Sequence, residues 1–315
     1  MYLPFLRGKQ FELLALREFA KEINRSTLIC PVVEPVKAEF KGLETAINEL
    51  ITQNVNFTIV VNPVIGEIEQ PEELLKFISN HKLLKSYTNY QVGLNSVSEK
   101  QITRHIKLLP NYNLEQKPLV LIYNDVIEDE EFVKANLNIG TVKYHIFNNS
   151  KIKGRRFRRL FDSSKKITLD DLFVSKSKNA DYLTQEDEFF SDEYLNYEEE
   201  GYIGFSDFLT IGDTYSDSGF LPYAVAIHIT YESSDGSIRI RHFVSDTNDD
   251  YSDTPGKFSE ALEKLIHFIP ELTIKTKAIE EFESFYLKGH YPGLGTVKKL
   301  SILHHLELMH KLLTR

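Results

Sequence analysis

The first half of the chain alternates short runs of β-branched residues with longer amphipathic runs. The short runs predict six strands, at 2–6, 28–33, 57–61, 90–94, 119–123 and 142–147. The longer runs carry apolar residues at helical spacing, as in FELLALREFAKEI, and predict helices between the strands. Strands that alternate with helices form a parallel sheet covered by helices, so we expect an α/β fold.

Polar residues end these strands at nearly regular intervals. After Glu34 the following ends, Asn62, Asn95, Asn124 and Asn148, come at steps of 28, 33, 29 and 24 residues. A strand, a crossover helix and two loops need about 30 residues. The spacing therefore predicts a series of βα units.

The pattern changes after residue 150. Eight basic residues and one acid occupy 151–166, and eight acids without a base occupy 186–200. Strand patterns return at 202–211 and 223–231. The second of these is followed by SSDG and then SIRIRHFVSD, which predicts a β-hairpin with Ile238, Ile240 and His242 on one face.

Counting the strands at 202–211 and 223–231, the pattern gives eight strands, which suggests a closed barrel. We therefore expect an α/β fold of the (β/α)8, TIM-barrel-like class. The barrel is expected as a single domain over 1–315, with an irregular charged insertion at 151–200 and a helical C-terminal extension at 257–315. The apolar stripe of the last helix is expected to close the core.

The composition narrows the functional classes. The chain has 315 residues and a formal net charge of −9, which argues against a general nucleic-acid or anionic-membrane binder. Cys30 is the single cysteine, so we expect no internal disulfide framework. No apolar run reaches the roughly 18 residues of a membrane span, and the opening MYLPFLRGKQ lacks the basic-then-apolar order of a signal peptide. We expect a cytoplasmic protein.

Three segments carry a resemblance to a known family, namely FLRGKQFELLALRE, VVEPVK and GHYPGLGTVKKLSILHHLELM. Together they resemble, nearly from end to end, an uncharacterised bacterial family related to the Beta proteins of phage and bacteria. The resemblance implies a (β/α)-barrel-like fold and an occurrence among mobile-element or antiphage defence genes. It implies no reaction, so it assigns no catalytic role to any residue.

The polar strand ends are the first candidate site, because the ligand site of an α/β barrel lies at the C-terminal ends of its strands. Cations and amides together suit an anionic or polyhydroxylated ligand. The residues expected to share this rim are Arg7, Lys9, Glu34, Lys37, Asn62, Asn95, Asn124, Asp125 and Asn148. The asparagines have an alternative interpretation as turn formers and helix N-caps. Glu34 has an alternative role in a buried ion pair with Lys9 or Arg7.

His228 is the candidate proton-transfer residue. Strict alternation in YAVAIHITY places it beside Ala224 and Ala226, and the small residues leave room for an inward imidazole near Glu34 or Asp246. A satisfied core histidine is the alternative. The expected catalytic set is therefore Glu34, His228 and Lys9, and the expected ligand-binding set is Arg7, Lys37, Asn62, Asn124 and Asp246.

Two further motifs give weaker signals. The order HHLELMH near the C-terminus is not the zinc motif HExxH, so we expect no metal site, and nothing in the sequence names a cofactor. The segment KIKGRRFRR offers phosphate contacts and one stacking ring. Its candidate nucleic-acid residues are Arg155, Arg156, Arg158 and Arg159. A solvated helix paired with the acidic block is the alternative, and nucleic acid is not an expected partner.

Two functional hypotheses follow. The first is a ligand-sensing or partner-binding barrel protein of a bacterial mobile-element or antiphage defence system, with a small anionic ligand or a protein partner encoded in the same operon. The second is a hydrolase or lyase acting on a phosphorylated or polyhydroxylated small molecule at the C-terminal rim of the barrel. The sequence leaves open whether the protein is an enzyme.

Overall fold

A computed structural model describes the chain except for residues 97 and 216–221. Its residues group into two compact units. The first unit comprises Met1–Leu13, Ala20–Asp171 and Glu193–Phe208, and the second comprises Leu14–Phe19, Leu172–Asp192 and Leu209–Arg315. We describe each unit by itself, and the single domain expected over 1–315 stays a prediction.

Eight parallel strands form the sheet of the first unit, in the order β1-β2-β3-β4-β5-β6-β7-β9. They are β1 (Phe5–Leu6), β2 (Val32–Val33), β3 (Phe57–Val60), β4 (Tyr90–Ser96), β5 (Leu119–Tyr123), β6 (Val142–Asn148), β7 (Lys166–Asp170) and β9 (Gly204–Asp207). The two ends of the sheet meet where Leu3 N donates to the Phe205 carbonyl at 2.9 Å and Phe205 N donates to the Met1 carbonyl at 3.0 Å. The sheet is thus a nearly closed barrel, and the TIM-barrel-like fold class is confirmed.

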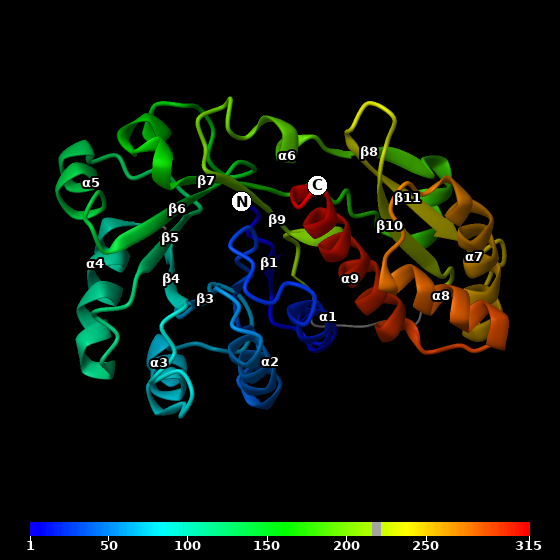
Figure 1. The fold of residues 1–315 in the computed structure, drawn as a ribbon, viewed down its shortest axis with the longest axis horizontal. Coiled ribbons are helices and arrows are strands. Elements are labelled where there is room, and N and C mark those ends of the chain that lie inside the picture. Colours follow the sequence, from blue (N-terminus) through cyan, green and yellow to red (C-terminus); the bar gives the residue numbers. More distant parts are fainter. Residues whose placement is uncertain (97, 216–221) are drawn as a thin grey trace. The chain divides into compact units, whose positions relative to one another are not determined.

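Helices connect the first six strands in the way that the sequence predicts. They are α1 (Gln10–Ala20), α2 (Lys41–Thr52), α3 (Pro71–Asn80), α4 (Glu99–Leu108) and α5 (Glu130–Asn136). Figure 1 shows α2 to α5 on the outside of the sheet, where each buries its apolar stripe. The connection from β6 to β7 contains only the 3₁₀ turns η2 (Phe157–Leu160) and η3 (Ser163–Lys165). The connection from β7 to β9 is long, and its last part before β9 contains the one-turn helix α6 (Glu193–Asn196).

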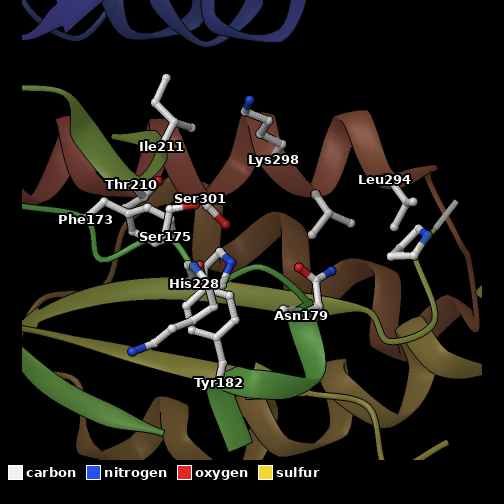
Figure 2. A pocket seen from close by; sticks show the side chains of 14 residues that line it. Phe173, Ser175, Asn179, Tyr182, Thr210, Ile211, His228, Leu294, Lys298 and Ser301 are labelled. Atoms are coloured by element: carbon white, nitrogen blue, oxygen red, sulfur yellow. The ribbon is translucent and has the colours of Figure 1, made fainter. Parts of the chain in front are cut away.

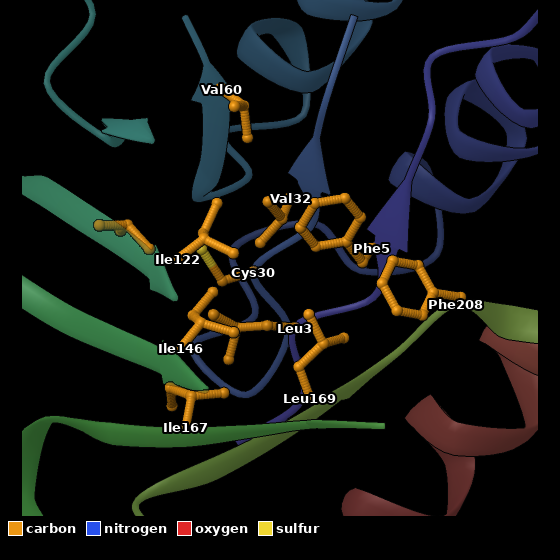
Figure 3. Close-up of a cluster of buried hydrophobic side chains, with 11 residues drawn as sticks. Leu3, Phe5, Cys30, Val32, Val60, Ile122, Ile146, Ile167, Leu169 and Phe208 are labelled. Carbon is orange, nitrogen blue, oxygen red and sulfur yellow. The ribbon is translucent and has the colours of Figure 1, made fainter. Parts of the chain in front are cut away.

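The barrel interior is filled by aliphatic and aromatic side chains (Figure 3). The cluster consists of Leu3, Phe5, Cys30, Val32, Val60, Val120, Ile122, Ile146, Ile167, Leu169 and Phe208. Burial raises the pKa of the Cys30 thiol to about 11. The thiol is therefore protonated at neutral pH and acts as a small apolar side chain of the core.

Closure of the barrel depends on a glycine at the seam between β9 and the first residues of the chain. A Cβ atom at Gly204 would lie 2.5 Å from the Met1 carbonyl oxygen and 3.0 Å from Cδ1 of Ile167. We expect Gly204→Ala to lower the free energy of unfolding by about 1–3 kcal/mol, the usual range for overpacking. Urea denaturation measures the change.

Gly140→Ala is the matched control for this seam, because a Cβ at Gly140 meets nothing within 4 Å. The control is expected to change stability by less than about 0.5 kcal/mol. Equal denaturation midpoints for the two variants would contradict the steric account of the seam.

The seventh and eighth barrel strands differ from those that the sequence pattern predicts. The seventh strand is β7, which lies inside the expected insertion at 151–200, and the eighth is β9, inside the predicted strand 202–211. The predicted barrel strand at 223–231 is wrong, because this segment pairs in a separate antiparallel sheet. The run KITLD of β7 has only three apolar or β-branched residues beside a basic block, so its strand signal is short and hidden by charge.

The second unit is built on that antiparallel sheet. Its strands are β8 (Asp187–Ser191), β10 (Ala226–Glu232) and β11 (Ile238–Val244), in the order β10-β11-β8. Helices α7 (Thr254–Phe268), α8 (Lys277–Lys288) and α9 (Leu294–Leu313) and the 3₁₀ turns η4 (Asn179–Thr184), η5 (Leu209–Ile211) and η6 (Ile269–Glu271) complete it. The hairpin predicted after residue 223 is confirmed, with Ile238, Ile240 and His242 buried on one face.

None of the helices in the described part of the chain combines the length and the apolar composition that crossing a membrane requires. The longest helix, α9, has 20 residues and contains several charged and histidine side chains.

Candidate functional site

A buried ion pair lies at the C-terminal ends of β1 and β2. The Arg7 guanidinium bonds Oε2 of Glu34, and the two residues are 7% and 0% exposed. Oε1 of Glu34 accepts hydrogen bonds from Val64 N at 3.1 Å and from Asn95 Nδ2 at 2.7 Å. Both carboxylate oxygens are thus engaged with protein groups, which is the ion-pair alternative that the sequence left open. This arrangement fixes the carboxylate rather than leaving it ready to accept a proton from a substrate.

Asparagine side chains continue this network around the mouth of the barrel. The side chain of Asn62 makes two hydrogen bonds to the backbone of Asn95, both at 2.8 Å. Asn62 Nδ2 donates to the Asn95 carbonyl, and Asn95 N donates to Asn62 Oδ1. Asn124 Nδ2 donates to Asn95 Oδ1 at 3.2 Å, and Asn148 Nδ2 donates to Asn124 Oδ1 at 3.0 Å. We call Glu34, Asn95, Asn124 and Asn148 the amide chain. Its members link four strands of the barrel and satisfy one another's polar atoms.

Two carboxylates at the same end of the barrel were missed by the sequence analysis. Asp170 and Asp207 end β7, which was not predicted as a strand, and β9, which was predicted to run on to residue 211. Asn149 Nδ2 donates to Asp170 at 2.9 Å, and the Tyr2 hydroxyl donates to Asp207 at 2.8 Å. Burial raises the pKa of Asp170, and the nearby Asp207 adds to the shift. The strand-end rule would have found Asp170 if β7 had been recognised, and Asp207 if the strand at 202–211 had been ended at residue 207.

The other residues predicted for the rim lie on the surface of the first unit. Lys37 forms an exposed ion pair with Glu67 at 2.7 Å. Lys9 is half-buried in the turn after β1, beside Gly8. Lys37 thus has an exposed carboxylate partner at the surface, and the ligand-binding role predicted for it stays a prediction.

The arginine-rich segment is largely exposed. Arg156 pairs with Glu130 at 2.7 Å, and Arg158 donates to the Ile152 carbonyl at 2.9 Å. Arg155 and Arg159 are exposed. Arg156 thus takes its partner from α5 rather than from the acidic block at 186–200.

His228 and Asp246 belong to the second unit rather than to the barrel. His228 lies on β10, so the inward barrel position predicted for it is wrong. Asp246 is exposed and pairs with Lys264 at 2.7 Å. The long apolar alternation in YAVAIHITY suits one strand of a half-buried antiparallel sheet as well as a barrel strand, and periodicity alone does not separate the two.

A cavity of about 400 Å³ opens beside His228 in the second unit (Figure 2). Residues 173–182, which lead into η4, form one side of the cavity. The turn η5, strand β10 and one face of α9 form the other sides. Its lining residues are Phe173, Ser175, Lys176, Asn179, Tyr182, Thr210, Ile211, Pro222, Ala226, His228, Leu294, Val297, Lys298 and Ser301. Segments more than a hundred residues apart in the sequence thus build one polar cavity.

Three side chains form a hydrogen-bonded row that starts at the cavity wall with His228 and continues behind it. Glu188 Oε1 lies 3.2 Å from His242 Nε2, and His242 Nδ1 lies 2.7 Å from His228 Nδ1. We call Glu188, His242 and His228 the histidine row. The rings of Phe173 and Tyr182 lie 5.1 and 4.8 Å from the His228 ring, centroid to centroid, and hold it edge-on.

Burial controls the charge of the histidine row. It lowers the pKa of His228 to about 3, and the neighbouring His242 adds to the shift. Burial also lowers the pKa of His242, against an opposing contribution from Glu188. Both imidazoles are therefore neutral at physiological pH, and each ring has one nitrogen with a free electron pair to accept a proton.

Cations and hydroxyls face the same cavity. Lys176 and Lys298 form no ion pair with any carboxylate of the described chain. Thr210 is 3% exposed, and its hydroxyl finds no hydrogen-bond partner among the residues that the structure describes. The lining of the cavity thus contains two lysines and no carboxylate among the residues that the structure describes.

The first turns of α9 supply one wall. Leu294, Val297, Lys298 and Ser301 recur at helical spacing and present a single face to the cavity. The N-terminal end of a helix carries a partial positive charge, which favours anions. The GLGTVKKL segment could have signalled this wall from the sequence. Lys176 and Glu188 carried no such signal, because they sit in the segment that looked like an irregular insertion.

No family model matches the chain, and no curated protein matches it. The resemblance to the family related to the Beta proteins therefore stays a prediction. Among the residues that the structure describes, no group of three or more His, Cys, Asp or Glu side chains is placed to hold a metal ion.

Proposed function

We propose that the protein binds a small anionic molecule in the cavity of the second unit. The observation that carries the proposal is that two lysines without carboxylate partners in the described chain, Lys176 and Lys298, line one cavity of about 400 Å³. A phosphate or carboxylate group would neutralise the charge of these lysines.

The mouth of the barrel supports ligand binding less well. There Glu34 and the amides of the amide chain already bond protein groups. A ligand would have to break those bonds before making its own, and each exchange returns little free energy. A hydrolase or lyase that uses Glu34 as its base meets the same obstacle, since both carboxylate oxygens accept hydrogen bonds from the protein.

The wider role remains the one that the sequence suggests. We propose a ligand-sensing protein of a bacterial mobile-element or antiphage defence system, located in the cytoplasm and acting with a protein partner encoded beside it. This part of the proposal is supported by the family resemblance and by the absence of a strong catalytic motif in the sequence. The cavity supports only the anionic ligand.

Isothermal titration with pyrophosphate tests the binding proposal. We expect the full chain to bind pyrophosphate, and we expect Lys298→Ala and Lys176→Ala to weaken the affinity about tenfold each, because each removes one charge-assisted contact. Raising the ionic strength should weaken binding further, since both lysines are partly exposed to solvent.

Lys82→Ala is the matched control for this titration, because Lys82 is an exposed lysine of the first unit. It should leave the affinity for pyrophosphate unchanged. Failure of the wild-type chain to bind, or equal weakening by all three substitutions, would contradict the proposal.

A further inference from the structure

The hydrogen-bonded order of the histidine row determines where its protons lie. Glu188 is 8% exposed, and its carboxylate can only accept, so His242 donates from Nε2. A neutral imidazole has one N–H group, so His242 Nδ1 is an acceptor, and His228 donates to it from Nδ1. The free electron pair of His228 is then on Nε2.

The Nε2 end of His228 opens on the cavity. His228 lines the cavity, and no hydrogen bond to its Nε2 is made by any other residue in the described part of the chain. In Figure 2 the His228 ring and the Ser301 hydroxyl point into the same space. The row thus runs from a buried carboxylate to a basic nitrogen that a ligand in the cavity would meet.

A purely structural histidine looks different in the same unit. His304 is buried in α9, and both of its nitrogens bond the protein, Nδ1 to the Thr276 hydroxyl at 2.8 Å and Nε2 to the Thr230 carbonyl at 2.6 Å. His228 uses one nitrogen in this way and leaves the other at the cavity. This asymmetry is what general-base catalysis requires.

We propose that the histidine row is a proton relay and that His228 is the general base of a phosphodiesterase site in this cavity. The inference rests on the proposed function, because Lys176 and Lys298 would hold the non-bridging oxygens of the phosphodiester. It names the substrate class and adds a reaction to the binding site.

The reaction step balances without a cofactor. His228 Nε2 takes a proton from a water molecule while the water oxygen forms a bond to phosphorus. The proton on His228 Nδ1 moves to His242 Nδ1, and the resulting imidazolium pairs with Glu188. The bond from phosphorus to the leaving alcohol oxygen breaks, and that oxygen takes a proton back from His228 Nε2 as the relay reverses. The products are a phosphate monoester and an alcohol.

Hydrolysis of bis(p-nitrophenyl) phosphate by the full chain tests the reaction. We expect turnover, and we expect His228→Gln to lower kcat by about 10²–10⁴, the usual contribution of a general base. Glu188→Gln acts through His242, so Glu188 is a positioning residue, and we expect a fall of about tenfold or more in kcat with KM within about twofold. A loss of binding alone would raise KM instead.

His267→Gln and Glu271→Gln are the matched controls, because both residues are exposed in the same unit. They should leave kcat and KM unchanged. A second readout needs no substrate: diethyl pyrocarbonate acylates neutral, accessible imidazole nitrogens, and mass spectrometry locates the product. We expect acylation at His228 and protection of it by pyrophosphate, while His304 stays unmodified in the folded chain.

The outcomes separate the two proposals. Pyrophosphate binding without any turnover of bis(p-nitrophenyl) phosphate overturns the catalytic inference and leaves the binding proposal standing. Turnover that survives His228→Gln overturns the assignment of the base. If pyrophosphate neither binds nor protects His228, the binding proposal fails as well.

Discussion

Replacing Arg7 with methionine is expected to lower the free energy of unfolding by about 3–5 kcal/mol. The substitution keeps an apolar side chain beside the rings of Phe5 and Phe208, which lie about 5 Å from the guanidinium. It removes the cation that neutralises the fully buried Glu34 carboxylate. A buried charge left without its partner keeps its desolvation penalty and loses its compensation. Urea denaturation followed by circular dichroism measures the loss.

Two further variants separate this interpretation from a general effect of losing a positive charge. Lys37→Met removes a cation from the exposed ion pair with Glu67, and we expect it to cost at most about 1 kcal/mol. The double variant Arg7→Met/Glu34→Leu removes both buried charges, and we expect it to recover a large part of the loss. A cost for Arg7→Met no larger than that for Lys37→Met would contradict the account of the buried pair.

The buried Arg7–Glu34 pair shows what the sequence could and could not predict at the mouth of the barrel. The strand-end positions of the polar residues could be predicted, but their role could not. The polar residues at strand ends follow from the alternation of strands and helices, and Glu34, Asn62, Asn95, Asn124 and Asn148 all lie where that alternation puts them. Whether such residues bind a ligand or one another depends on distances of a few tenths of an ångström. Sequence spacing contains no information at that scale.

The fold class could be predicted from the periodicity of apolar residues. The errors in assigning two of the strands have a physical origin. Strands β1, β2, β3 and β5 are buried along their whole length and read as short runs of apolar and β-branched residues, which the sequence shows clearly. Strand β7 is five residues long and begins with Lys166 directly after a basic block. Strand β10 reads like another barrel strand, yet it pairs in an antiparallel sheet. In both cases the local pattern does not show which sheet the strand joins.

The candidate site was only partly visible for the same reason. His228 was singled out by the small residues around it, whereas the last helix was expected only to close the core. Their assembly into one cavity depends on Lys176 and Tyr182, which lie more than 100 residues before α9 in a charged region. Chemistry that is built from several short segments gives no contiguous motif.

Acid is expected to unfold the protein steeply between pH 6.5 and about 4. Burial lowers the pKa of His145 and of His228 to about 3 and that of His304 to about 4. In the unfolded chain each has an ordinary pKa of about 6.5, so below that pH the unfolded state binds more protons than the folded state. The stability contributed by the neutral histidines is therefore complete above pH 6.5 and is lost as the pH falls toward their folded pKa values.

The size of this effect follows from proton linkage. One proton bound only by the unfolded state changes the free energy of unfolding by about 1.4 kcal/mol per pH unit, so three give about 4 kcal/mol per pH unit over the two compact units together. The raised pKa of Asp170 opposes this loss, because its folded form binds a proton first. Urea denaturation at constant ionic strength, repeated from pH 7.5 to 4.5, measures the slope.

His145→Phe assigns part of that slope to a single residue. His145 is fully buried, stacks near Tyr123 and Phe161, and its Nε2 finds no hydrogen-bond partner in the described part of the chain. Phenylalanine fits this aromatic cluster and cannot titrate, so we expect the slope to fall by about 1.4 kcal/mol per pH unit. The exposed His267, replaced by Gln, should leave it unchanged. A wild-type slope below that of one proton would show that these histidines are not held neutral by burial.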